Sequence, residues 1–393
     1  MVKIYQRYLA AQFILPFLFS ALFFVTFLLT FQLFQVMQVV IGKDVDNLLI
    51  LHLIGHIALS FLPMAIPISI LFATIYTMSR FSEDSELIAL RAFGISKFRL
   101  FFPIFLMTLL IALALFSLNR SLIPNSRAQF RNTLIVLSSQ GMLSNVKPEQ
   151  FYMEIPGVTL FAESVSESGD EFGEVFILLG DSRGVEEKVI TAKKGKMLKS
   201  FEQHDQFTQP SLRMFLENGS ITTTRSDDET VEVIHFQEYD FPIVTDFFGP
   251  STIARDSMRT NRHLKELIDK RVDRLKELEQ KDRLRRQERL ELEELEEQIP
   301  KSLIEYFTRF NTPVQCLVFS LLGFSLGVKQ GRGKSKNSGG MSIIIVIAYY
   351  VVFFTGASLT QRGIVSPMMT TFLPTLIAFL FALYYFKKVD WLS

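Results

Sequence analysis

The sequence is poor in cysteine and has almost no net charge. Cys316 is the only cysteine among 393 residues, so no intrachain disulfide can form. The 41 Lys and Arg residues nearly balance the 40 Asp and Glu residues, which gives a net charge of +1. A chain without a strong overall charge has no long-range attraction for nucleic acid, so we expect none as a partner. Any soluble part of the protein must be held together by its apolar core.

The sequence also lacks the residues of a nucleotide, metal or catalytic site. Residues 331–335 (Gly-Arg-Gly-Lys-Ser) end like a Walker loop, but Val328 stands where its first glycine is required. His52 and His56 have a spacing that could hold a metal, although helix packing is the favoured interpretation. No nucleophile–base arrangement is found, nor the ladder of membrane carboxylates that proton-coupled transporters use. The sequence therefore predicts no catalytic residue, no cofactor and no metal.

Long apolar runs, by contrast, are abundant. Hydrophobic residues make up 49% of the chain, Phe alone occurs 39 times, and the mean hydropathy is +0.27. A helix needs about 20 apolar residues to cross the hydrocarbon core of a bilayer. Six segments satisfy this requirement: 8–41, 48–79, 98–122, 303–328, 341–361 and 366–386. The first run is too long for a signal peptide, so we expect it to be a retained membrane helix.

The positions of Lys and Arg predict the orientation of these segments. Basic residues gather before the first segment and after the second, fourth and sixth: Lys3, Arg7, Arg80, Arg91, Lys97, Arg99, Lys329, Arg332, Lys334, Lys336, Lys387 and Lys388. The opposite short loops carry only Lys43 and Arg362. Because cytoplasmic loops are enriched in Lys and Arg, we expect both termini in the cytoplasm and the central region in the periplasm of a bacterial cell.

The central region becomes β-rich near Gln150. Five short runs are rich in β-forming residues: 150–154, 158–162, 175–179, 212–216 and 231–236. Asn218-Gly219, between the last two runs, predicts a hairpin turn. Many short strands without helical periodicity indicate a sandwich, a jelly roll or a partly open barrel. The predicted fold class is a membrane α-helical protein, with six transmembrane helices and an inserted all-β domain.

A highly charged segment, 261–298, separates the β-rich region from the last three apolar runs. Opposite charges recur one helical turn apart, as in Glu266 with Lys270. A helical hairpin or short coiled coil and a solvated spacer helix are both compatible with this pattern. The predicted parts of the chain are 1–122 with the first three membrane helices, 123–260 with the β domain, 261–300 with a charged helical linker, and 301–393 with the last three membrane helices.

The loop between the second and third apolar runs has the pattern of a short amphipathic helix. Ser82 can cap it, acidic residues follow in the first turn, and Gly94 can end it. Carboxylates near the helix start are repelled by anionic lipids, which disfavours a helix lying on the membrane surface. The loop is better suited to docking into a groove with a basic rim on another protein.

Several motifs together resemble one known family. The most specific is Asp84-Ser85-Glu86-Leu87 with Arg91-Ala92-Phe93-Gly94-Ile95-Ser96. Other matching motifs are Gln150-Phe151, Phe161-Ala162-Glu163-Ser164-Val165, Phe236-Gln237-Glu238-Tyr239, Tyr306, Arg309, Pro313, Leu321-Leu322-Gly323, Arg362-Gly363 and Leu373-Pro374. Over nearly its whole length the chain is similar to the LptF/LptG permeases of the lipopolysaccharide exporter, an ABC transporter. Gln330-Gly331-Arg332 is more similar to the LptF branch than to the LptG branch.

This resemblance implies a permease subunit rather than an enzyme. A paralogous LptG-like permease, a separate cytoplasmic ABC ATPase dimer and LptC/LptA-like periplasmic bridge proteins would be its partners. Lipopolysaccharide would be its substrate, and the periplasmic domain would be jelly-roll-like. The ATPase-coupling residues implied, in a helix near 82–94, are Glu83, Asp84, Ser85, Glu86, Leu87, Leu90, Arg91 and Gly94. The lipid-binding residues implied are Gln35, Lys43, Phe151, Met153, Phe161 and Arg309.

Two other classes of function are compatible with the sequence. One is a secondary transporter with a periplasmic sensor domain, which an ATPase that co-purifies would exclude. The other is a membrane assembly scaffold that transports nothing, whose depletion would leave glycolipid at the inner membrane undisturbed.

Overall fold

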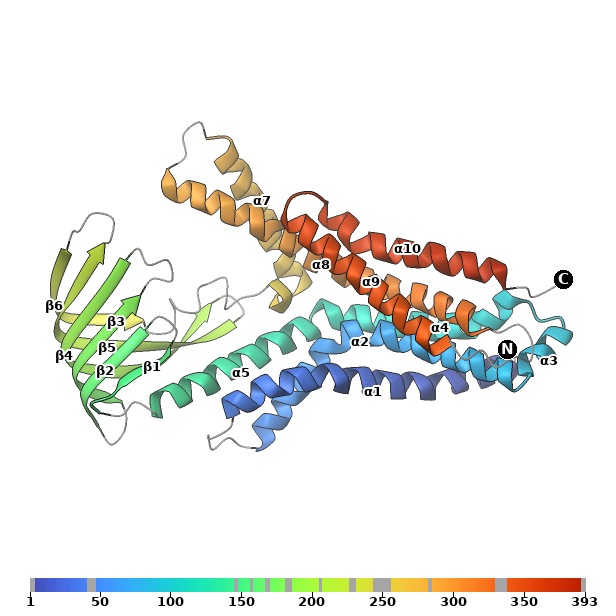
Figure 1. The fold of residues 1–393 in the computed structure, drawn as a ribbon, viewed down its shortest axis with the longest axis horizontal. Coiled ribbons are helices and arrows are strands. Elements are labelled where there is room, and N and C mark those ends of the chain that lie inside the picture. Colours follow the sequence, from blue (N-terminus) through green and yellow to red (C-terminus); the bar gives the residue numbers. More distant parts are fainter. Residues whose placement is uncertain are drawn as a thin grey trace. The chain divides into compact units, whose positions relative to one another are not determined.

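The fold is given by a computed structural model. It describes residues 4–40, 47–144, 148–155, 158–166, 170–180, 186–204, 207–225, 231–242, 256–281, 285–328 and 338–389. The chain forms two compact units, of which the first comprises Met1–Leu33, Ile54–Arg127 and Asp256–Ser393. The second comprises Phe34–Leu53 and Ala128–Arg255. Figure 1 shows the order of helices and strands along the chain.

The helices include the six predicted membrane segments. They are α1 (Ile4–Val40), α2 (Asn47–Glu83), α3 (Glu86–Ala92), α4 (Lys97–Arg120), α5 (Leu122–Ser144), α7 (Asn261–Glu279), α8 (Arg286–Gly327), α9 (Ser338–Gln361) and α10 (Pro367–Lys388), with the 3-10 turn η1 (Asp256–Met258). Helices α1, α2, α4, α8, α9 and α10 are long and apolar enough to cross a membrane. The prediction of six membrane helices is therefore confirmed.

Helix α8 is the centre of the first unit, because it packs against α2, α4 and α10. Gly323 and Gly327, four residues apart, face α2. A methyl group on Gly323 would lie 2.8 Å from the Cβ of Thr74, and one on Gly327 would lie 2.6 Å from the Cβ of Met78. Small residues at this spacing let membrane helices approach closely, where hydrocarbon provides little hydrophobic driving force. No larger side chain fits at this contact.

The charged segment is helical and continuous with the fourth membrane helix. It forms α7 and the first part of α8, which runs without a break through Pro300 and Pro313. Leu264, Ile268 and Leu278 of α7 are buried, and α7 packs against α8. The two helices thus form a hairpin, the first of the two arrangements that the sequence allowed.

The second unit contains a six-stranded antiparallel sheet. Its strands are β1 (Phe151–Ile155), β2 (Val158–Val165), β3 (Glu171–Gly180), β4 (Glu186–His204), β5 (Phe207–Arg225) and β6 (Val231–Pro242). Each strand pairs with its neighbour in sequence. This order is a meander, so the described strands lack the crossovers of a complete jelly roll. The inserted β domain is confirmed, and its strands begin only after α5.

The sheet is creased along one line across β2 to β6. At that line, consecutive inward-facing positions are three residues apart instead of two: Ala162 and Val165, Phe172 and Val175, Ala192 and Gly195, Leu216 and Gly219, Phe236 and Tyr239. The residues between them form what we call the crease: 163–164, 173–174, 193–194, 217–218 and 237–238. The strand registers align these positions side by side. Two successive side chains per strand therefore point outward at the crease.

The hairpin turn predicted at Asn218-Gly219 is wrong. Both residues lie inside β5, and Gly219 is paired with Ala192 on one side and Phe236 on the other. Asn218 has a φ of 52°, a conformation that asparagine tolerates and that here distorts the strand instead of ending it. A side chain on Gly219 would collide with the carbonyl of Thr191 and the ring of Phe236. The glycine is therefore required by close packing beside the crease.

Candidate functional site

Helix α3 lies between membrane helices α2 and α4, but it begins later than predicted. Helix α2 continues to Glu83, and the Ser82 hydroxyl donates to the Met78 carbonyl at 2.9 Å instead of capping α3. The chain then turns at Asp84 and Ser85, where Ser85 has a φ of 58°. The predicted start was wrong because Glu83 is the last residue of α2 and Asp84 lies in the turn, so that of the three acidic residues only Glu86 stands in the first turn of α3.

The end of α3 agrees with the prediction. Gly94 has a φ of +72°, which side chains larger than hydrogen rarely adopt. Its amide donates to the carbonyl of Arg91 at 2.9 Å, and the amide of Ile95 donates to that of Leu90 at 3.3 Å. These two hydrogen bonds are those of a Schellman motif, which satisfies the last carbonyls of the helix.

The two faces of α3 have different surroundings. Leu87 is buried in a core cluster with Phe386 and Val389 of the C-terminal region, and Leu90 packs against the same cluster. By contrast, the side chain of Ile88 is exposed and Phe93 is 84% exposed. The apolar surface that α3 offers to another molecule is therefore formed by Ile88 and Phe93, which the sequence analysis did not single out.

Polar contacts hold α3 in place. The Tyr8 hydroxyl of α1 donates to the Glu86 carboxylate at 3.2 Å. Arg80 and Asp84 form an ion pair of 3.7 Å, with both side chains more than half exposed. Glu86 keeps only this single long hydrogen bond among the contacts described, so its carboxylate can accept a second, charged donor. Glu83 and Ser85 are exposed beside it, and Arg91 is half-buried.

Lys97 joins the α3 region to the end of α10. Its ammonium donates to the carbonyls of Phe386 and Val389, at 3.1 and 3.4 Å, and lies 5.0 Å from the centroid of the Phe386 ring. A cation at a helix C-terminus is stabilised by the helix dipole and satisfies carbonyls that lack intrahelical partners. The loop that carries α3 is thus attached to the last membrane helix.

Arg309, one of the expected lipid-binding residues, is held by protein groups. Its side chain is 4% exposed. Nε donates to the Glu305 carboxylate at 3.1 Å, and the two terminal nitrogens donate to the carbonyls of Arg259 and Asp256 and to Asn261 Oδ1. Arg127 adds a second ion pair to Glu305 at 3.4 Å. A lipid phosphate would reach Arg309 only if these hydrogen bonds broke. The contacts of Arg309 therefore indicate a structural role, in which it joins the start of α7 and the segment before it to α8.

The other expected lipid-binding residues are located as follows. Lys43 and the side chains of Gln35 and Met153 lie outside the described part of the structure. Phe151 and Phe161 are cross-strand partners with ring centroids 5.0 Å apart. Their neighbours Tyr152 and Leu160 belong to the buried core of the sheet. Because side chains alternate along a strand, the Phe151–Phe161 pair is on the outward face, opposite the apolar core.

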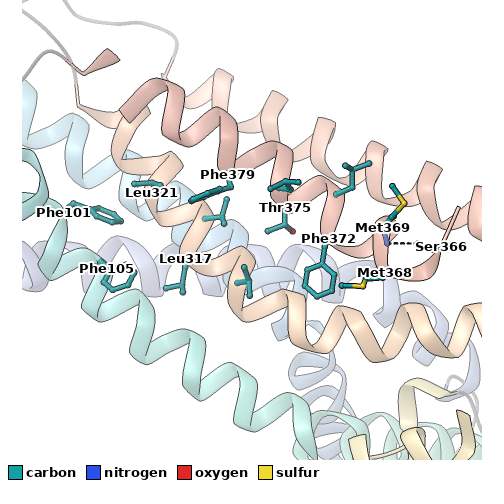
Figure 2. A pocket seen from close by; sticks show the side chains of 14 residues that line it. Phe101, Phe105, Leu317, Leu321, Ser366, Met368, Met369, Phe372, Thr375 and Phe379 are labelled. Atoms are coloured by element: carbon teal, nitrogen blue, oxygen red, sulfur yellow. Dashed lines mark hydrogen bonds between the residues drawn. The ribbon is translucent and has the colours of Figure 1, made fainter. Parts of the chain in front are cut away.

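An apolar pocket of about 700 Å³ lies between α4, α8 and α10 (Figure 2). Figure 2 shows Phe101 and Phe105 on one side and Phe372 and Phe379 on another. Ser366 and Thr375 are its polar lining residues, and the Ser366 hydroxyl already accepts a hydrogen bond from an amide of its own helix, at Met369. Such a lining suits a hydrocarbon chain and offers nothing that would bind a charged headgroup.

Comparison with known proteins gives one family. A family model described as "Lipopolysaccharide export system permease LptF/LptG" matches residues 7–388. No curated protein matches the chain. The family match does not separate LptF from LptG, and residues 330–332, on which the LptF prediction rests, lie outside the described residues. A multi-pass protein of the inner membrane agrees with both this match and the six apolar helices.

Proposed function

We propose that this chain, which belongs to the LptF/LptG family of lipopolysaccharide export permeases, is a permease subunit of an ABC transporter. The transporter extracts lipopolysaccharide from the inner membrane and passes it to periplasmic bridge proteins similar to LptC and LptA. A separate cytoplasmic ATPase dimer supplies the energy. The family match over residues 7–388 is the observation that carries this proposal.

A second permease accounts for the uneven burial of the membrane helices. Only 6% of the apolar window of α1 and 11% of that of α9 are buried, against 67% for α8. The exposed face of α1 is aromatic, with Phe19, Phe23, Phe27 and Phe31 at four-residue intervals. Faces of this kind suit a paralogous LptG-like subunit and the acyl chains held between the two subunits.

The ATPase dimer docks on α3. Phe93 is the most exposed aromatic side chain of this loop, and the side chain of Ile88 is exposed as well. An apolar anchor next to an acidic group fits a partner groove with an apolar floor and a basic rim. Glu86 supplies the charge, while Leu87 and Leu90 fix the helix to the permease from its other side. The remaining loop residues expected to take part, Glu83, Asp84, Ser85, Arg91 and Gly94, shape the turns on either side.

The proposed orientation follows from the basic loops. Both termini and α3 are cytoplasmic, and the β domain is periplasmic, where it hands the lipid to the bridge. The partly buried apolar residues that pack against the core of the sheet, among them Ile221, Phe236 and Tyr239, form the surface suited to acyl chains.

The experiment is purification of the complex in mild detergent, with identification of bound proteins and lipids. Glu86→Lys should reduce ATPase recovery, because reversing a charge at a partly buried interface costs about 2–5 kcal/mol. Phe93→Ala should reduce it as well, through loss of the anchor. Matched controls are Glu163→Lys in the β domain and Ile364→Ala, another exposed apolar loop residue.

The outcomes separate the candidate functions. Normal ATPase recovery in both α3 variants removes the docking assignment. Absence of any ATPase from the wild-type complex, with transport retained, favours a secondary transporter. Depletion of the protein without accumulation of glycolipid at the inner membrane favours a scaffold.

A further inference from the structure

A recess of about 580 Å³ lies on the outward face of the sheet, beside the crease. It extends over β2 to β5, and Gly173 forms part of its floor. In the strand register, Gly173 is flanked by Ser164 on one side and Lys194 on the other. A methyl group on Gly173 would collide with the Ser164 hydroxyl. The recess therefore exists because one crease position lacks a side chain and its neighbour is small. We call it the outer recess.

Charged groups of both signs line the outer recess. Lys196 pairs with Glu171 across β3 and β4, with Nζ 2.9 Å from the carboxylate. This hydrogen bond holds the pKa of the Glu171 carboxyl below its ordinary value, so the pair is charged at neutral pH. Lys194 is opposite Glu217 in the register of β4 and β5. Two ammonium groups and two carboxylates give the outer recess no net charge.

The remaining lining adds hydroxyls and one aromatic surface. Ser164 and Ser166 contribute hydroxyl groups from β2, and Phe215 contributes a half-exposed ring from β5. Phe215 is the register partner of Lys196, so the ring and the ion pair are neighbours. Donors, acceptors and an aromatic face thus lie together in a space of the size that small-molecule sites have, roughly 300–1,000 Å³.

We propose that the outer recess binds an uncharged sugar unit of the transported glycolipid, an inference that rests on the proposed function. An isolated phosphate would meet Glu171 and Glu217 as well as the lysines, and an ammonium group would meet the lysines. A sugar ring presents alternating donors and acceptors to such groups, and its C–H face packs on an aromatic ring. The lining of the outer recess is therefore complementary to a ligand with many hydroxyl groups and no net charge.

The location on the sheet supports this assignment. The inward face carries the apolar cluster, and the outward face beside the crease carries the polar recess. A glycolipid is itself divided into acyl chains and saccharide. One sheet can therefore provide separate surfaces for the two parts, with the crease setting where the polar surface begins.

The test measures binding of a lipid-free, dephosphorylated core oligosaccharide to the full-length protein in detergent, by saturation-transfer NMR and calorimetry. Lys194→Gln should weaken binding about tenfold, the effect of losing one hydrogen bond to a charged group. Lys193→Gln is the matched control, because it removes the same charge from the adjacent exposed residue, which does not line the outer recess. Glu217→Gln provides a second variant, and thermal unfolding verifies that each variant is folded.

The results distinguish this inference from the proposed function. Binding that falls in Lys194→Gln and Glu217→Gln, but not in Lys193→Gln, supports the outer recess. Equal binding by all variants, no binding by the wild type, or full competition by inorganic phosphate would each overturn the assignment. If the oligosaccharide fails to bind while intact lipopolysaccharide still co-purifies, only this inference is lost. If neither associates with the protein, the proposed function fails.

Discussion

Replacing Arg309 with methionine tests whether this residue is structural or a lipid ligand. In the structure its guanidinium is buried and bonded to Glu305, Asn261 and the backbone carbonyls of Asp256 and Arg259. These partners come from η1 and the residue that follows it, from the start of α7 and from α8. A neutral side chain of similar length would keep most of the packing and remove every one of these hydrogen bonds.

The expected loss of stability follows from the groups left behind. Breaking a buried ion pair by removing one partner costs about 3–5 kcal/mol. Each buried acceptor without a donor costs about 1–3 kcal/mol. Glu305 retains Arg127 and is itself about a quarter exposed, and the carbonyl of Asp256 retains the amide of Arg259. Two acceptors, the Arg259 carbonyl and Asn261 Oδ1, lose the donor that Arg309 supplied, so we expect a loss of about 2–6 kcal/mol. Arg309→Lys should lose nearly as much, since one ammonium cannot reach acceptors arranged around a planar fork.

Stability is measured by reversible unfolding in mixed detergent and SDS micelles, followed by circular dichroism, with bound lipid quantified in parallel. Arg262→Met is the control, because Arg262 is 86% exposed and its ion pair within the described residues is with Glu266, one turn away. If Arg309→Met unfolds like the control but less lipopolysaccharide co-purifies with it, the structural role is refuted and a direct contact between Arg309 and lipid is supported.

Three further predictions concern topology, lipid path and the charged hairpin. Cysteine placed at Ser85 should react with impermeant reagents only from the cytoplasmic side, and cysteine at Glu163 only from outside; the reverse pattern would invert the proposed orientation. A photo-crosslinking residue at Tyr239, which packs on the apolar core, should capture the acyl chains of lipopolysaccharide during export, whereas one at outward-facing Phe161 should not capture them. Leu264→Ala should lower the unfolding free energy by about 2–5 kcal/mol, because Leu264 is fully buried, and should leave ATPase recovery unchanged.

Features of the fold that depend on local composition could be predicted from the sequence. An apolar run of membrane length identifies a span without knowledge of its neighbours, and all six were found. Strand β4 was missed because lysines, among them Lys193, Lys194 and Lys196, interrupt its apolar residues. Its alternation is broken by the crease, where inward positions such as Ala192 and Gly195 are three residues apart. Such a shift is recognisable only when the neighbouring strands are known to share it.

The candidate site depended on contacts that sequence spacing does not reveal. Helix α3 has apolar residues on both sides. Helical spacing places Leu87 and Leu90 on one face, and the family resemblance implied that this face takes part in coupling. The structure buries Leu87 with Phe386, which is far away in the sequence, and leaves Phe93 open to solvent. Arg309 was assigned to lipid on the family resemblance, without knowledge of its neighbours in the fold. Its acceptors include two backbone carbonyls, and a backbone acceptor leaves no signature in the sequence.

The packing around α3 determines which membrane helices would move with it if an ATPase docks there as proposed. Leu87 shares a core cluster with the end of α10, and Lys97 bonds to the carbonyls at that same end. Helix α2, which leads directly into α3, meets α8 at Gly323 and Gly327 without space for a side chain. Close-packed interfaces transmit displacement because they have few alternative arrangements. We therefore expect a force applied to α3 to move α2, α8 and α10 together with the start of α1, where Leu9 and Phe13 are buried in the same cluster, and the largely exposed α9 to move against them.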